Sequence, residues 1–145
     1  MFVSKGRCNV CHLGPDFSNG EFHDIGIPFF VEPGRVDPGR HEGIRKLGAS
    51  RHTLPGPFND DPVRAPGTST RHVSLEHRNY GEFKVPGLRN VARTAPYMHN
   101  GSLKTIRDVV RHYSEIDPDR LHTDGERILV PLKLDPRETA DLIAF

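Results

Sequence analysis

Long apolar segments are missing from this sequence. No stretch of it approaches the roughly 20 residues that a helix needs to cross a bilayer. No charge of one sign dominates either, because 20 Lys and Arg face 19 Asp and Glu, so nucleic acid is not an expected partner. Hydrophobic residues make up only 34% of the 145 residues, which is little for the self-sufficient core of a single domain.

Glycine and proline, by contrast, are frequent. The chain has 14 glycines and 13 prolines, which favours long irregular loops over dense regular structure. A chain with few apolar residues and many loops needs something besides side chains at its centre. A bound cofactor would fill that space.

The two cysteines of the chain stand close together, in Cys8-Asn9-Val10-Cys11-His12. This is the C-x-x-C-H pattern of covalently attached haem, in which both thiols add to the haem vinyl groups. The adjacent imidazole then reaches the iron from the same face. We therefore predict one haem c, held by Cys8, Cys11 and His12.

Three other interpretations of the motif are open. A zinc site would need two more good ligands, and a second C-x-x-C is absent. A thioredoxin-like redox pair is expected within a βαβ unit, and no such alternation surrounds the motif. A disulfide between the two cysteines would leave His12 without a role.

The pattern along the chain predicts a mainly α structure with much coil. Residues 1–12 are expected to form a helix that ends at the haem. Residues 27–80 are predicted to be an ordered loop with one helical turn, because Pro and Gly interrupt them repeatedly. Residues 105–115 show the clearest helical periodicity, with Ser102 as a candidate cap. Residues 136–145 have the proline and acidic residues of a helix start.

Tyr113 belongs to the apolar face of the helix predicted over residues 105–115. The other members of this face are Leu103, Ile106, Val109 and Val110. Tyr113 is therefore expected to point toward the centre of the domain, as a core tyrosine with a paired hydroxyl or as a ligand of the cofactor.

Both ends of the chain are expected to be truncated. Cys8 leaves little room for a leading helix, and the last helical pattern stops before it is complete. Residues 1–145 are therefore interpreted as a single haem domain from a longer parent protein.

Four motifs follow one another along the chain. They are residues 11–17, residues 22–28, the segment from Phe83-Lys-Val-Pro-Gly-Leu-Arg-Asn to Tyr-Met-His-Asn-Gly-Ser102, and residues 109–113. In this order they resemble the C-terminal haem domain of bacterial di-haem cytochrome c peroxidases and their MauG relatives. The resemblance implies a cytochrome c-like haem domain with long irregular loops, whose six-coordinate haem transfers electrons.

The resemblance also implies an axial ligand opposite the imidazole of the motif. From chemistry alone Met98 is a candidate, since His/Met pairs are common in cytochromes c. The family places this ligand 17 residues after the proline that corresponds to Pro96, where this chain has Tyr113. We therefore favour Tyr113, with Met98 as the alternative. Histidines in such motifs more often make structural hydrogen bonds, which is our expectation for His99 and His112.

Two further sets of residues are candidates for binding. Arg89 and Arg93 flank the Leu-Arg-Asn-Val run and are expected either to pair with the haem propionates or to be solvated at the surface. By resemblance, the backbone carbonyls of Thr94 and Pro96 match the positions that hold a calcium ion between the two haem domains. A carbonyl oxygen suits a hard cation, but the remaining ligand would come from the other domain.

These expectations point to an enzyme parent, a cytochrome c peroxidase or MauG-like oxidase. Only one C-x-x-C-H is present, so the haem that reacts with hydrogen peroxide would lie in an N-terminal domain, and this chain alone should be inactive. The implied partners are that domain and an electron donor, a cytochrome c or cupredoxin, or else an oxidised protein substrate. Haem attachment of this type implies a periplasmic parent. The alternatives are a stand-alone mono-haem electron carrier and a degenerate domain used only for binding.

Overall fold

The computed structural model describes residues 1–27, 30–61, 63, 67–120 and 128–145. The α-helices are α1 (Arg40–Ala49), α2 (Thr68–Arg71), α3 (Ile106–Ser114) and α4 (Pro136–Ala144). The strands are β1 (Phe22–His23), β2 (Phe30–Glu32), β3 (Arg35–Val36) and β4 (Phe83–Lys84). Short 3-10 helices are η1 (Cys8–Val10), η3 (His77–Asn79), η4 (Val91–Arg93) and η5 (Pro118–Arg120).

The strands form two small antiparallel pairs, β1 with β4 and β2 with β3. The described residues therefore mix helix, short strands and coil, and the prediction of a mainly α domain is correct only in part. Among the helices in this part of the chain, none is long and apolar enough to cross a membrane.

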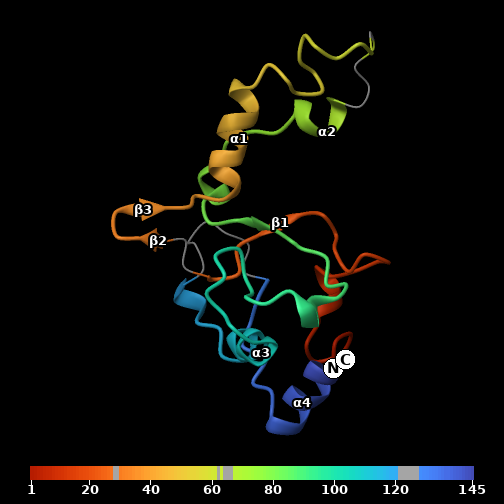
Figure 1. Ribbon diagram of the computed structural model, residues 1–145, viewed down its shortest axis with the longest axis vertical. Helices are drawn as coiled ribbons and strands as arrows, with labels where there is room; N and C mark the ends of the chain where they lie inside the picture. The colour runs from red at the N-terminus through yellow and green to blue at the C-terminus, as the bar shows by residue number, and fades with distance from the viewer. Residues whose placement is uncertain (28–29, 62, 64–66, 121–127) are drawn as a thin grey trace.

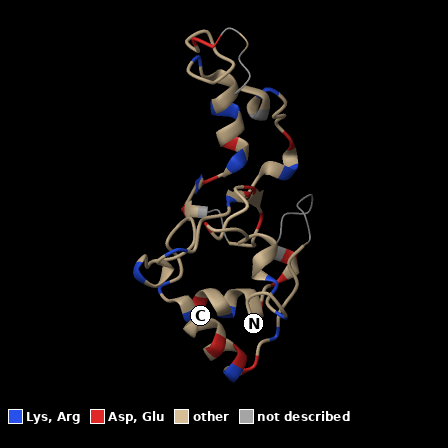
Figure 2. Cartoon of the chain, turned by 90° about the vertical axis from the view of Figure 1, so that its right-hand side faces the viewer, with Lys and Arg blue, Asp and Glu red and all other residues tan. Residues whose placement is uncertain are grey.

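The molecule consists of a body and a projecting arm (Figure 1). The body holds both chain ends, α3, α4 and the β1–β4 pair, and the arm is the excursion from α1 through α2 to η3. Figure 2 shows the arm still extended after a quarter turn, so its projection is not an effect of the view. The segment predicted as a loop over residues 27–80 forms most of this arm. Residues 28, 29, 62 and 64–66 of that segment lie outside the described part.

The ten-residue helix α1 contradicts the prediction of a loop with one helical turn. Its larger apolar residues are Ile44 and Leu47, too few to show helical periodicity. Ion pairs across successive turns support it instead, because Glu42 lies 2.6 Å from Arg45 and 3.8 Å from Lys46.

The helix predicted for residues 1–12 is also wrong. The chain forms turns there, and only η1 is helical. Arg7 has a φ of 49°, in the left-handed region, which interrupts any right-handed helix at that point. A Cβ on the preceding Gly6 would lie 2.9 Å from the carbonyl oxygen of Met1, so the turn is too tight for a larger residue.

The helix predicted for residues 105–115 is confirmed as α3, and the helix predicted from Pro136 is confirmed as α4. The start of α3 is capped by Thr105 and not by Ser102. The side chain of Thr105 accepts from the backbone N–H of Asp108, whose carboxylate accepts from the backbone N–H of Thr105. This reciprocal pair satisfies two backbone donors that would otherwise face solvent.

A buried polar cluster joins the arm to the body. Asn79 and Glu82 are 2% and 4% exposed. The side-chain amide of Asn79 and the guanidinium of Arg40 each donate to Glu82 Oε2 at 3.1 Å. The Asn79 amide oxygen also accepts from the backbone N–H of Glu76 at 2.9 Å. A buried carboxylate needs such donors, so this cluster fixes where the arm leaves the body.

The apolar core is sparse. The buried apolar residues are Ile27, Val85, Val110 and Ile116. Among the described residues, no side chain is less than 2% exposed. Well-packed domains bury more than this, so the observation agrees with the expectation that the centre requires a cofactor.

We predict that Asn79→Ala lowers the free energy of unfolding by about 2 kcal/mol, because the buried carboxylate of Glu82 loses a donor. Asn59→Ala is the matched control, since Asn59 makes the same two kinds of hydrogen bond in the half-buried loop of the arm. It should cost less than about 1 kcal/mol. Urea unfolding of both variants measures the difference, and equal losses would contradict a special role for the buried cluster.

Candidate functional site

The Cys8–His12 segment turns tightly at the edge of the body. Cys8 begins η1, and the backbone N–H of His12 donates to the Cys8 carbonyl at 2.8 Å. Cys8 and Cys11 are not joined in a disulfide, and both residues are half-buried. Burial raises the pKa of the Cys8 thiol, whereas a reactive redox cysteine has a lowered pKa. The raised pKa is unlike that of a reactive redox cysteine.

The imidazole of His12 is held by two backbone carbonyls. Its Nδ1 lies 3.0 Å from the oxygen of Phe17 and 3.1 Å from the oxygen of Pro86. Because a carbonyl can only accept, Nδ1 carries a proton and donates to both oxygens. This leaves Nε2 as the ring nitrogen that can bind a metal.

Local backbone conformation aims these two carbonyls at His12. Phe17 has a φ of 51°, a left-handed conformation that costs a non-glycine residue about 1 kcal/mol or more. Gly87 follows Pro86, and a Cβ on Gly87 would lie 2.8 Å from the carbonyl oxygen of Asp16. The two segments therefore touch where glycine alone leaves room for the contact.

Tyr113 interacts electrostatically with the two cysteines. It lies on α3, three residues after the buried Val110, and is itself half-buried. Burial raises the pKa of the Tyr113 phenol, and the charges of Cys11 and Cys8 raise it further. The pKa of the phenol therefore depends on two thiols that stand more than 100 positions earlier in the sequence.

The remaining axial candidates differ in their surroundings. Met98 is half-buried with a φ of 69° and stays the alternative ligand. His99 stacks on Phe83 with ring centroids 3.5 Å apart, and burial lowers the pKa of its imidazole. The Nε2 atom of His112 lies 2.7 Å from the carbonyl oxygen of Ile25. His112 therefore makes the structural hydrogen bond that was expected of it.

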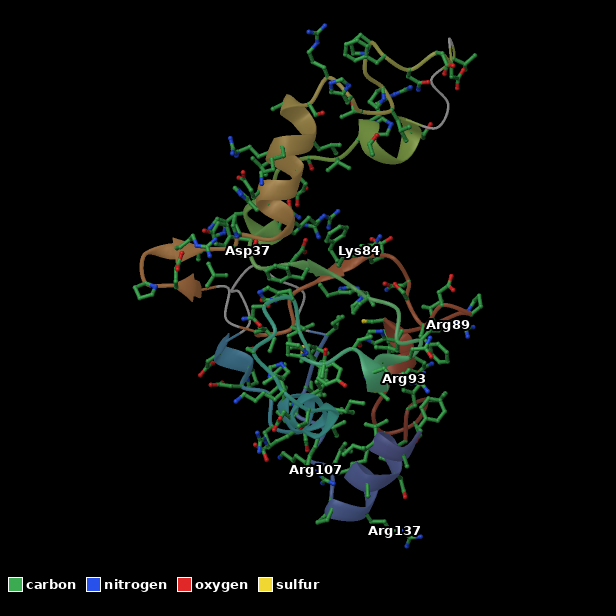
Figure 3. The ribbon with its side chains drawn as sticks, in the orientation of Figure 1. Asp37, Lys84, Arg89, Arg93, Arg107 and Arg137 are labelled. Atoms are coloured by element: carbon green, nitrogen blue, oxygen red, sulfur yellow. The ribbon has the colours of Figure 1, made fainter. Side chains whose placement is uncertain are left out.

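Arg89 and Arg93 both lie at the edge of the body (Figure 3). The Nε atom of Arg89 is 3.9 Å from the carboxylate of Asp16, and its guanidinium is 5.9 Å from the ring centre of Phe17. The Arg89 side chain is 63% exposed, and Arg93 is exposed on η4. A contact of either arginine with haem propionates stays a prediction.

The calcium prediction also stays open. Thr94 donates from its hydroxyl to the carbonyl of Val91 at 3.1 Å, and the Ala95–Pro96 peptide bond is cis. Within the described ranges, no cluster of three or more His, Cys, Asp or Glu side chains is arranged to hold a metal ion. The predicted calcium ligands are backbone carbonyls, so that search does not test them.

Sequence reasoning missed the residues that hold His12. Phe17 and Pro86 act through their carbonyls, which every residue has, so their identity gave no signal. The one visible signal was the turn chemistry of Ser18-Asn19-Gly20, which predicts a compact loop after the motif but not its contact with Pro86.

The residues of this site fit a haem. Two half-buried thiols on one turn suit thioether attachment, and Nε2 is the nitrogen of the adjacent imidazole that can bind a metal. The same thiols influence the pKa of a phenol on α3. The sparse core leaves the centre of the body without large buried side chains in the described part of the chain.

Comparison with known proteins gives relatives over the whole chain, although no family model matches. The chain is 33% identical over 147 aligned residues to cytochrome-c peroxidase IdrP1 of Pseudomonas sp. (strain SCT), with 100% of this chain aligned. It is 29% identical over 144 residues to the methylamine utilization protein MauG of Methylophilus methylotrophus, with 98% aligned. The chain spans 37% and 32% of the lengths of these two relatives.

A solved structure shows a similar fold. It is the crystal structure of a MauG-like protein associated with microbial copper homeostasis, with a TM-score of 0.64 and 23% identity. The match covers 99% of this chain and 40% of that one, so it includes the arm as well as the body.

We predict that Gly87→Ala lowers the free energy of unfolding by about 2 kcal/mol, because its Cβ would force the Pro86 and Asp16 segments apart. Gly43→Ala in α1 is the matched control, because its Cβ would meet nothing within 4 Å. It should stabilise the chain by up to about 1 kcal/mol through helix propensity. Denaturant unfolding of each variant measures whether the substitution raises or lowers the free energy of unfolding. A stabilising effect of Gly87→Ala would show that the two segments do not touch.

Proposed function

Because this chain belongs to the family of bacterial di-haem cytochrome c peroxidases and MauG proteins, we propose that it is the haem-binding electron-transfer domain of such an enzyme. The observation that carries the proposal is how the imidazole of His12 is hydrogen-bonded. Two carbonyls hold its Nδ1, and Cys8 and Cys11 of the same turn are half-buried and not joined in a disulfide. This arrangement suits a tethered haem and gives no comparable role to a thiol redox pair.

In this proposal, each residue of the site has a distinct task. Cys8 and Cys11 tether the haem, and His12 supplies the imidazole ligand. A haem bound there would supply a one-electron ferric–ferrous couple. The carbonyls of Phe17 and Pro86 keep the imidazole in the required tautomer and orientation.

We propose Tyr113 as the second axial ligand. The helix α3 carries it, its pKa depends on both cysteines, and the segment after residue 128 braces that end of the helix. The backbone N–H of Leu132 donates to the carbonyl of Tyr113 at 3.2 Å. A phenolate is anionic and favours the ferric state more than a thioether does, so Tyr113 in place of Met98 would lower the reduction potential. The raised pKa of the phenol means that a cation must replace its proton for it to act as a phenolate.

The rest of the catalytic apparatus belongs to the parent protein in this proposal. The relatives are roughly three times as long as this chain, which leaves room for the domain whose haem reacts with peroxide. The chain would then be the C-terminal domain, in a periplasmic parent. The carbonyls of Thr94 and Pro96 would contribute to a calcium ion at the junction with the other domain.

Electrons would enter or leave near the C-x-x-C-H turn. Val10 and Leu13 are each 48% exposed there, and Arg89 lies at the edge of the body beside Phe17. An apolar surface bordered by a cation suits brief contact with an electron-donor protein, a cytochrome c or cupredoxin, or with a protein that the enzyme oxidises.

We predict that the chain, produced in a host that attaches haem c, carries one haem through Cys8 and Cys11. The mass should increase by that of one haem, and the colour should survive denaturation. Cys8→Ser combined with Cys11→Ser should leave the chain without covalent haem. Ser4→Ala is a control in the same N-terminal turn that keeps both thiols. Colourless wild-type protein with two titratable thiols would contradict the proposal.

The same double variant tests the relay in the complete parent protein. Oxidation of the electron donor should fall by two or more orders of magnitude, because electrons no longer reach the peroxide-reactive haem. The spectrum of that other haem should be unchanged. Full turnover by the variant would favour a purely structural role for this domain.

We predict that Tyr113→Phe changes the ligand field of the ferric haem. Wild-type protein should lack the near-infrared sulfur-to-iron band of a His/Met haem, and the variant should lose the wild-type spectrum. Tyr97→Phe is the matched control, because its hydroxyl donates to the carbonyl of Val91 at 3.0 Å. An unchanged spectrum in Tyr113→Phe, with loss of a sulfur band in Met98→Leu, would assign Met98 instead.

A further inference from the structure

The hydroxyl of Ser18 joins the two segments whose carbonyls hold His12. It donates to the carbonyl of Val85 at 2.7 Å, across 67 positions in sequence. It also accepts from the backbone N–H of Gly20 at 3.0 Å, which orients it within its own loop. Ser18 directly follows Phe17, and the Val85 carbonyl belongs to the peptide unit that leads into Pro86. The carbonyls of Phe17 and Pro86 accept from His12 Nδ1. The Ser18 hydroxyl therefore connects the residue after Phe17 to the peptide unit before Pro86.

We propose that Ser18 is a positioning residue for the haem-binding histidine, keeping the carbonyls of Phe17 and Pro86 on His12 Nδ1. The inference rests on the proposed function, because control of Nδ1 matters for chemistry only where Nε2 binds iron.

Two backbone hydrogen bonds also keep the loop folded, but neither of them involves the carbonyl of Val85. The backbone N–H of Asn19 donates to the carbonyl of Cys11 at 2.8 Å, which closes the loop after the motif. The backbone N–H of Val85 donates to the carbonyl of Glu21 at 2.8 Å, on the side away from Pro86. Both bonds survive removal of a side chain at position 18. Loss of the hydroxyl should therefore relax the acceptors of His12 without unfolding the loop.

The Val85–Pro86 peptide depends on Ser18 because proline has no N–H. The nitrogen of Pro86 cannot donate to a neighbour and so cannot anchor this peptide. The carbonyl of Val85 is its hydrogen-bonding group, and Ser18 supplies a donor to it. Val85 itself is buried, at 7% exposure, so an unpaired carbonyl there would be costly. The peptide would rotate to find another donor and turn the Pro86 carbonyl away from His12.

The consequence is electronic as well as geometric. A hydrogen bond donated by Nδ1 makes the imidazole a stronger donor to a metal through Nε2. A stronger donor favours the ferric state over the ferrous state. Weakening one of the two hydrogen bonds should therefore shift the ferric–ferrous equilibrium toward ferrous. A residue with a purely structural role would not produce this shift.

The test is a spectroelectrochemical titration of the haem-loaded chain. The variants are Ser18→Ala, Ser18→Thr, Ser18→Val and Ser50→Ala. Threonine and valine have nearly the same shape, but threonine has a hydroxyl where valine has a methyl group. Ser50 is the matched control, because its hydroxyl also accepts from the backbone N–H two positions on, at His52. At a fixed applied potential, the ferrous-to-ferric ratio should rise about fivefold in Ser18→Ala and Ser18→Val, as for one hydrogen bond of ordinary strength. Ser18→Thr and Ser50→Ala should match wild type.

The outcomes separate this inference from the proposed function. Haem-loaded Ser18→Ala and Ser18→Val with the wild-type ratio would overturn the role of Ser18 and leave haem binding intact. A shift in Ser18→Thr equal to that in Ser18→Val would overturn it as well. Wild-type chain without haem would overturn both. Loss of haem in both hydroxyl-free variants, with normal loading in Ser18→Thr and Ser50→Ala, would support the same role at the stage of haem binding.

Discussion

The hydrogen bonds from His12 Nδ1 to two backbone carbonyls are the constraint on which the site depends. They set the tautomer of the imidazole, and they join the C-x-x-C-H turn and the loop directly after it to the exit of β4, 74 positions from His12 in sequence. The left-handed conformation of Phe17 and the glycine at position 87 are local consequences of the same contact. Both are unfavourable or unusual by themselves and are held by the surrounding structure.

The small apolar core is consistent with a domain that holds a cofactor at its centre. Among the described residues, four apolar side chains are buried, and Phe2 contacts Phe17 and Phe145 with ring centroids 5.9 Å and 5.1 Å apart. A tethered cofactor would supply the missing apolar volume and, through two thioethers, would not depend on the core for its retention. Stability and chemistry would then share one centre, and the ion pair of Lys5 and Glu138, at 2.6 Å, joins the two end segments of the chain.

Polar contacts stabilise the arm. Ion pairs along α1 and the buried cluster of Arg40, Asn79 and Glu82 hold it. The alignments with IdrP1 and MauG cover 100% and 98% of this chain, so they extend across the arm.

The sequence by itself determined the motif chemistry and the elements with strong local signals. The residue types and spacing of Cys8, Cys11 and His12 predict a haem site, and periodicity, proline and acidic first turns predict α3 and α4. It did not determine the turn before Cys8 or the helix α1, because a left-handed Arg7 has no residue signature and two apolar residues show no period. Only the tertiary structure decided which carbonyls hold His12 and which hydroxyl reaches Val85. Backbone acceptors are the same in every residue, and contacts across 67 and 74 positions depend on how the whole chain folds, so no local pattern encodes them.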